Sequence, residues 1–97
     1  MHIISHKKIR LFYELYPEVR TSLEHWYEVA QNADWKNFAD IKRDFNSVDS
    51  IGNQRYVFNI KGNHFRLVVV IKFSIGRIFI RFVGTHKEYD KIDCLTI

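Results

Sequence analysis

Hydrophobic residues in the first half of the chain recur every three or four positions, the spacing of one face of an α-helix. Ser5 supplies an N-cap, and Pro17 ends the first helix and opens the second. A short strand over His2–Ser5 precedes these helices, and a third, shorter helix is predicted over Asn37–Phe45. The apolar stripes, which we interpret as core, are Ile9, Phe12, Tyr13 and Tyr16 in the first helix, and Val19, Leu23, Trp26, Tyr27 and Ala30 in the second.

The spacing of hydrophobic residues changes to two after the turn-rich stretch "NSVDSIGNQ", which we expect to be a loop. Strands are predicted over Arg55–Ile60, His64–Phe73 and Arg77–Val83, and the short connections "KGN" and "SIG" favour antiparallel hairpins. One face of these strands is wholly apolar and requires a cover: Tyr56, Phe58, Ile60, Leu67, Val69, Ile71, Phe73, Ile78, Ile80 and Phe82.

The two helical stripes are the only large apolar surfaces available to cover that face. The pattern therefore predicts an α+β protein with two layers, in the order β-α-α-β-β-β, and a single domain over residues 1–97. The longest aliphatic run, Leu67–Ile71, is far shorter than the ~20 residues that span a bilayer. The N-terminus has no signal-peptide pattern and the chain has one cysteine, so we expect a cytoplasmic protein without membrane contact.

Charge divides the chain into two unlike halves. Residues 1–50 carry seven Lys or Arg and eight Asp or Glu, whereas residues 51–97 carry eight Lys or Arg and three acids. Strand parity places five cations on the face opposite the core, together with apolar residues and without any acid: Arg55, Arg66, Lys72, Arg77 and Arg81. This pattern favours a sheet surface that binds a polyanion, and the alternative is a basic surface that serves solubility.

The sequence lacks the usual motifs of metal and nucleotide sites. Its five histidines have no ligand spacing, and no CxxC, P-loop or GxGxxG occurs, so we expect neither a metal nor a cofactor. Cys94 has no matching base pattern and is interpreted as a small hydrophobic residue.

Proton-transferring residue types gather instead in "GTHKEYDKID", Gly84–Asp93, directly after the last strand. Antiparallel pairing brings the start of the second long strand and the end of the third to one sheet edge, so Arg66 and His86 can be neighbours. A histidine with an arginine suits RNA cleavage without metal, in which the ribose 2′-OH attacks the adjacent phosphate. Taken singly, each residue also has an ordinary structural interpretation, such as a loop histidine or an arginine in a surface ion pair.

Three segments, "DWKNFADIKRDF", "VFNIKGNHFRLVV" and "RFVGTHKEYDKID", resemble the HigB-type toxins of the RelE/ParE superfamily. The resemblance implies a RelE-like fold and ribosome-dependent endoribonuclease activity on translated mRNA. It also implies inhibition of translation and growth, neutralised by a helix-turn-helix antitoxin of the HigA type. The implied partners are this antitoxin, the ribosomal A site with its mRNA, and rRNA on the basic sheet face.

The resemblance assigns phosphate stabilisation to Arg66, since "FRLV" matches the arginine that has this role in the superfamily. RelE has another arginine two residues after the glycine that ends its last strand, and here that position is His86. We expect His86 to be the general acid or base, Lys61 to neutralise the phosphate and Tyr89 to stack on a base, although His86 and Tyr89 could exchange proton roles. The residues expected to bind RNA are Asn63, Arg81, Lys87, Lys91, Arg55 and Lys72.

Two other functions remain open at this point. A ParE-like toxin with the same fold would poison DNA gyrase through protein contacts and would need no acid or base. A non-toxic RNA-binding protein would leave growth unaffected. The sequence also leaves open whether an antitoxin covers His86 or blocks entry to the ribosome from another surface.

Overall fold

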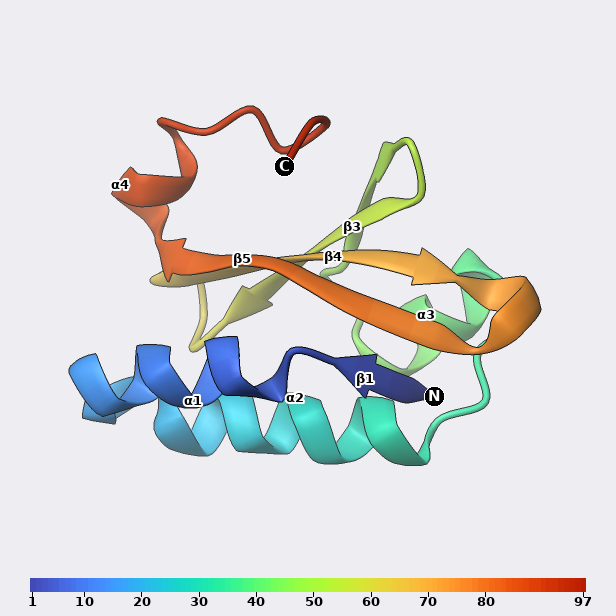
Figure 1. The fold of residues 1–97 in the computed structure, drawn as a ribbon, viewed down its shortest axis with the longest axis horizontal. Coiled ribbons are helices and arrows are strands. Elements are labelled where there is room, and N and C mark those ends of the chain that lie inside the picture. Colours follow the sequence, from blue (N-terminus) through green and yellow to red (C-terminus); the bar gives the residue numbers. More distant parts are fainter.

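The computed structural model describes all 97 residues, and its centre is a five-stranded sheet with the order β1-β5-β4-β3-β2 (Figure 1). β1 runs parallel to β5, and every other neighbouring pair of strands is antiparallel. The strands are β1 (His2–Ile4), β2 (Asp49–Gly52), β3 (Arg55–Ile60), β4 (Phe65–Lys72) and β5 (Arg77–Thr85).

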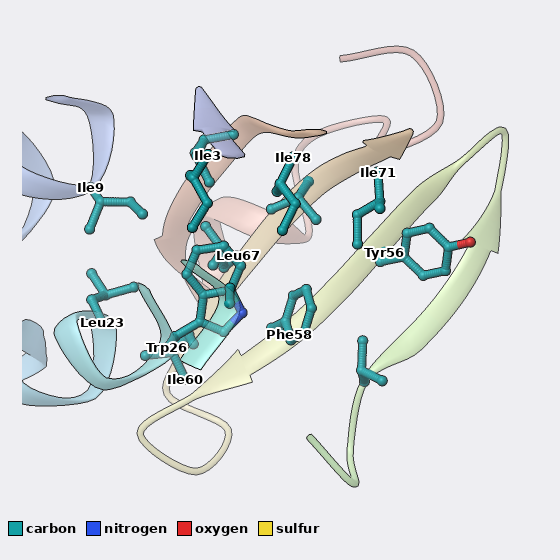
Figure 2. Packing of buried hydrophobic residues seen from close by; sticks show 14 of the residues in the cluster. Ile3, Ile9, Leu23, Trp26, Tyr56, Phe58, Ile60, Leu67, Ile71 and Ile78 are labelled. Carbon is teal, nitrogen blue, oxygen red and sulfur yellow. The ribbon is translucent and has the colours of Figure 1, made fainter. Parts of the chain in front are cut away.

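Two long helices, α1 and α2, lie side by side beneath one face of this sheet (Figure 1), so the predicted two-layer α+β fold is confirmed. The apolar faces of both helices pack against the sheet in one core. There the Trp26 ring packs edge-on against Phe58, with 5.3 Å between the ring centroids (Figure 2). No helix combines the length and apolar character needed to cross a membrane. The helices are α1 (His6–Leu15), α2 (Arg20–Asn32), α3 (Phe38–Asp44) and α4 (His86–Tyr89), with 3₁₀ turns η1 (Pro17–Val19) and η2 (Phe73–Ile75).

The helix ends follow the sequence signals with one exception. Pro17 follows the end of α1 and opens η1, and the side chain of Asn37 caps α3 by accepting a hydrogen bond from the Asp40 N–H at 3.1 Å. Ser5 precedes α1 as predicted, but its backbone is left-handed, with φ 78°, and its side chain makes no capping bond. The first helix therefore begins at a sharp turn out of β1.

The stretch predicted as a loop, Asn46–Gln54, contains a strand. β2 pairs with β3, and the turn between them consists of Asn53 and Gln54, whose φ angles are 53° and 62°. Two consecutive positive φ angles match the twist of a tight hairpin. The prediction was wrong because β2 is short and mostly exposed, so it lacks an apolar alternation, and its turn lacks the usual glycine at the second position.

A β-bulge at Arg81 reverses the predicted facing of the end of β5. Val69 pairs with Ile80 but Val68 pairs with Phe82, so Arg81 is an extra residue in the strand. Phe82 therefore lies on the face opposite the helices, and Val83 packs against the core, the reverse of the strict alternation expected from the sequence. The sequence pattern cannot show this extra residue, because Phe82 and Val83 are both apolar and either could face the core.

The face opposite the helices is not an open platform. The chain after β5 forms α4 and then crosses over this face, so that its end lies above β3 (Figure 1). Val57, Val68 and Val70 on this face are at most 4% exposed. The predicted basic sheet surface is therefore reduced to cations around a covered apolar centre.

The shared core predicts a large difference between two leucine truncations. Leu67 is completely buried on β4, whereas Leu15 on α1 is 76% exposed. We expect Leu67→Ala to lower the free energy of unfolding by about 2–5 kcal/mol, because it leaves a cavity that the sheet and helices cannot fill. Leu15→Ala, the matched control, should change it by less than about 0.5 kcal/mol. Denaturant titration would measure both, and equal losses would contradict the position of the core.

Candidate active site

The four residues expected to be catalytic come from one end of the sheet, where β4 begins and β5 ends. Phe65 pairs with Thr85, and Arg66 pairs with Gly84. Immediately beyond, the backbone N–H of His86 donates a hydrogen bond to the carbonyl oxygen of His64 at 3.1 Å. The antiparallel register thus brings the backbones of Arg66 and His86 to the same edge, as the strand arrangement predicted.

Local sequence signals hold α4 in place at this edge. The Thr85 side chain accepts a hydrogen bond from the Glu88 N–H, and the Glu88 carboxylate accepts one from the Thr85 N–H, which forms a capping box. Gly84 leaves room for this turn, since a Cβ there would lie 2.5 Å from Phe82 Cζ and 3.2 Å from Glu88 Oε1. The Thr-x-x-Glu pattern was the signal for this helix, which the sequence analysis did not predict.

Arg66 and Tyr89 are in contact at this edge. The Arg66 guanidinium carbon lies 5.7 Å from the centroid of the Tyr89 ring, within the range of a cation–π contact. The other side-chain bond of Arg66 is a long one, 3.5 Å, to the carbonyl oxygen of Asn63. The guanidinium therefore keeps several N–H donors free for an anion, and the interpretation of Arg66 as one half of a surface ion pair is wrong.

The Tyr89 hydroxyl is half-buried and lies 3.6 Å from Cys94 Sγ. Burial, with a smaller contribution from the bond to Cys94, raises the pKa of Tyr89 to about 12, although Arg66 opposes the shift. Tyr89 is therefore a neutral hydrogen-bonding group at physiological pH. Cys94, interpreted from the sequence as a small hydrophobic residue only, is a direct neighbour of this site.

His86 lies at the first position of α4 with about half of its side chain exposed. Its Nδ1 lies 3.2 Å from Asp90 Oδ2, one helical turn later. At this distance the Asp90 carboxylate can pair with the imidazole when Nδ1 carries a proton. Asp90 was not assigned a role from the sequence, although the i, i+4 spacing from His86 was a usable signal.

Lys61 lies in the β3–β4 turn with a left-handed backbone, φ 52°, followed by Gly62 in the same region. Its side chain is exposed and borders two surface hollows. The smaller hollow, of about 380 Å³, lies between this turn, the end of β5 and η1, and both His64 and Glu18 line it. His64 is a titratable neighbour that the sequence analysis did not assign to the site, although its position two residues before Arg66 places it there.

The remaining predicted residues divide into two groups. Asn63, Lys87 and Lys91 are exposed in the β3–β4 turn and around α4, and Arg81 is exposed at the bulge. Arg55 and Lys72 lie toward the other end of the strands, where Lys72 Nζ donates to Gln54 Oε1 and Arg55 donates to backbone carbonyl oxygens. Asn63, Lys87 and Lys91 thus lie at the same end of the sheet as Arg66, Arg81 lies beside α1, and Arg55 and Lys72 lie away from this end.

The ion pairs of the chain do not involve the lysines and arginines that follow residue 50. Four of the five ion pairs join residues of the first half of the chain, and the fifth is His86 with Asp90. None of the eight Lys and Arg residues after position 50 pairs with an Asp or Glu side chain. Nowhere in the chain do three or more His, Cys, Asp or Glu side chains cluster as metal ligands would.

Comparison with known proteins adds an independent finding. A sequence model of the HigB toxin family, described as the RelE-like toxic component of a toxin-antitoxin system, matches residues 19–92. The mRNA interferase toxin HigB of Escherichia coli K12 is 35% identical over 92 residues, which cover 93% of this chain and 88% of that protein. The mRNA interferase HigB of Escherichia coli O6:H1 is 30% identical over 94 residues, which cover 95% and 91%.

The close approach at Gly84 predicts a destabilising substitution. Gly84→Ala should lower the free energy of unfolding by about 1–3 kcal/mol, because the new methyl group displaces the Phe82 ring. The double variant Gly84→Ala with Phe82→Leu, compared with Phe82→Leu alone, should show a smaller loss. Equal losses in both backgrounds, measured by denaturant titration, would show that Phe82 is not the obstacle.

The raised pKa of Tyr89 predicts a loss of stability at high pH. The folded protein holds the phenol proton more tightly than the unfolded chain, whose tyrosine pKa is 10.0, so this stability is present below pH 10 and is lost as the pH rises towards 12. We expect the free energy of unfolding to fall less steeply between these values in Tyr89→Phe. Parallel curves for the two proteins would contradict the shift.

Proposed function

This chain belongs to the HigB family of RelE-like toxins of toxin-antitoxin systems, and we propose that it is an mRNA interferase that cuts messages bound to translating ribosomes. The observation that carries the proposal is the pairing of Arg66 with Tyr89 beside His86, at a sheet edge where the lysines and arginines lack carboxylate partners. The names of the similar proteins, mRNA interferase HigB, support the same activity.

The proposed reaction is attack of a ribose 2′-OH on the adjacent phosphate. His86 Nε2 takes the proton of the 2′-OH, while Asp90 holds Nδ1 and so fixes the ring. The P–O bond to the 5′ oxygen of the next nucleotide breaks and this oxygen takes a proton from water, which leaves a 2′,3′-cyclic phosphate and a 5′-OH. All bonds are made and broken by proton transfer and nucleophilic displacement, so the residues named here suffice without a metal.

Charge develops on the non-bridging phosphate oxygens in this transition state, and Arg66 is the group proposed to stabilise it. Its guanidinium offers planar N–H donors that match two phosphate oxygens. The Tyr89 ring beneath it limits the positions that the guanidinium can take. Lys61, exposed in the neighbouring turn, contributes a second positive charge to the phosphate.

The raised pKa of Tyr89 supports one of the two assignments of proton roles that the sequence left open. A phenol with a pKa of about 12 is protonated at neutral pH and is a poor base. We therefore assign the base to His86 and give Tyr89 the role of a neutral donor that orients the phosphate or the leaving oxygen. Stacking of Tyr89 on an RNA base would compete with its contact to Arg66.

The ribosome is proposed to supply what the isolated site lacks. The hollows beside Lys61 are open surface depressions, and they offer little that would fix a flexible RNA by themselves. An mRNA that is already ordered in the ribosomal A site would present the phosphate to be cleaved in a fixed position. Asn63, Arg81, Lys87 and Lys91 are the exposed groups proposed to contact mRNA or rRNA, through phosphate interactions that weaken with salt.

A helix-turn-helix antitoxin of the HigA type is the proposed partner that silences the activity. The unpaired cations after residue 50 would attract an acidic segment of such a protein as well as RNA.

The test is cleavage of an mRNA by the purified protein with and without translating ribosomes, followed by analysis of the product ends. We expect cuts only in ribosome-bound mRNA, with 5′-OH and cyclic phosphate ends. Arg66→Ala should lower the rate by about 10²–10³ and His86→Gln by about 10²–10⁴, because each removes a group that acts in the transition state. Arg10→Gln, an exposed charge loss on α1, should leave the rate unchanged.

Three outcomes would overturn parts of the proposal. Ends with 5′-phosphate and 3′-OH would exclude 2′-OH attack. Full activity of His86→Gln would exclude its role as base. Growth arrest with gyrase-dependent DNA breaks and without RNA cleavage would favour a ParE-like toxin instead.

A further inference from the structure

The segment that follows α4, residues 90–97, is called the strap here because it crosses the face of the sheet opposite α1 and α2 (Figure 1). Its far end is bound to the β2–β3 hairpin. Arg55 Nη2 donates a hydrogen bond to the Ile97 carbonyl oxygen, and Asn53 Nδ2 donates one to the Leu95 carbonyl oxygen at 3.1 Å. The strap thus connects the hairpin turn to α4 and the candidate active site.

The strap also has internal bonds that limit its freedom. The Ile92 N–H donates to the Tyr89 carbonyl oxygen at 3.2 Å, which extends the turn of α4 into the strap. Asp93 accepts from the Leu95 N–H through its carboxylate and from the Thr96 N–H through its carbonyl oxygen, both at 3.1 Å. These bonds hold Cys94 in the position where its Sγ lies 3.6 Å from the Tyr89 hydroxyl.

The Arg55 guanidinium is bonded to backbone oxygens at two of its nitrogens. Besides its bond to Ile97, its Nη1 donates to the Asn53 carbonyl oxygen at 3.1 Å. Its Nε is buried and has no partner. Burial of this N–H without a partner has a cost in desolvation, which the two bonds made by the same guanidinium offset in part.

We propose that Arg55 and Cys94 are positioning residues of the active site, which act through the strap to hold Tyr89 against Arg66. Arg55 anchors the far end of the strap, and Cys94 contacts the phenol at its near end. This inference rests on the proposed function for its effect on cleavage, but not for its effect on Tyr89. It replaces the sequence-based expectation that Arg55 binds RNA.

Positioning by the strap has a distinct kinetic consequence. Tyr89 limits the orientation of the Arg66 guanidinium, which acts on the transition state and not on the bound mRNA before reaction. Loss of the strap contact should therefore lower kcat while KM stays nearly constant. An arginine that binds RNA phosphates directly would instead raise KM and change the salt dependence of binding.

The experiment compares Arg55→Gln, Cys94→Ala and the conservative variant Cys94→Ser, whose hydroxyl can still bond to Tyr89. Tyrosine ionisation is followed by ultraviolet absorbance, with Tyr89→Phe subtracted to identify the signal of Tyr89. Cleavage of ribosome-bound mRNA is measured in parallel. Arg10→Gln serves as the control for the loss of one positive charge, and thermal unfolding confirms that each variant is folded.

We expect Arg55→Gln and Cys94→Ala to lower the tyrosine pKa from about 12 toward 10.0, because both expose the phenol to water. Both should lower kcat by about tenfold with KM changed by less than about twofold, whereas Cys94→Ser should stay close to the unaltered protein.

An unchanged Tyr89 titration in folded Arg55→Gln would overturn the positioning role, whatever happens to activity. A rise in KM with a constant kcat would return Arg55 to the group of RNA-binding residues and would also overturn it. If no form of the protein cleaves mRNA, the proposed function fails, and the titration alone then decides whether the strap positions Tyr89.

Discussion

The antiparallel pairing of β4 with β5 is the constraint on which the site depends. It places Arg66 opposite Gly84, two residues before His86, so an arginine at the start of one strand and a histidine beyond the end of the next meet at one edge. The side chains come from rigid strands and a capped turn of helix, which limits their movement. Each later feature of the site, including the contact of Tyr89 with Arg66, requires this register.

The two faces of the sheet are covered in different ways. On one face, α1 and α2 bury a large apolar core around Trp26 and Phe58 (Figure 2). On the other, α4 and the strap lie over three buried valines, and the cations stay at the margins without Asp or Glu partners. Cations that do not pair with an Asp or Glu side chain are free to attract phosphates.

Much of the fold was predictable because hydrophobic periodicity reports which face of an element is buried. It located α1, α2, α3 and the three long strands, with Pro17 and Asn37 marking helix ends. It failed for β2, which is polar and short, and for the end of β5, where the extra residue Arg81 exchanges the faces of Phe82 and Val83. Strand alternation does not reveal a bulge, because an extra residue is recognised only from the register with the partner strand.

The sequence alone determined the two-layer fold, the excess of cations after residue 50 and the neighbourhood of Arg66 and His86, because these follow from residue order and the geometry of hairpins. Only the tertiary structure decided which groups touch. It placed Tyr89 under Arg66, Cys94 beside the phenol, Asp90 on His86 and the Arg55 side chain on the strap. These contacts depend on where a segment without periodicity crosses the sheet, and its path is set by packing and hydrogen bonds between residues far apart in the chain.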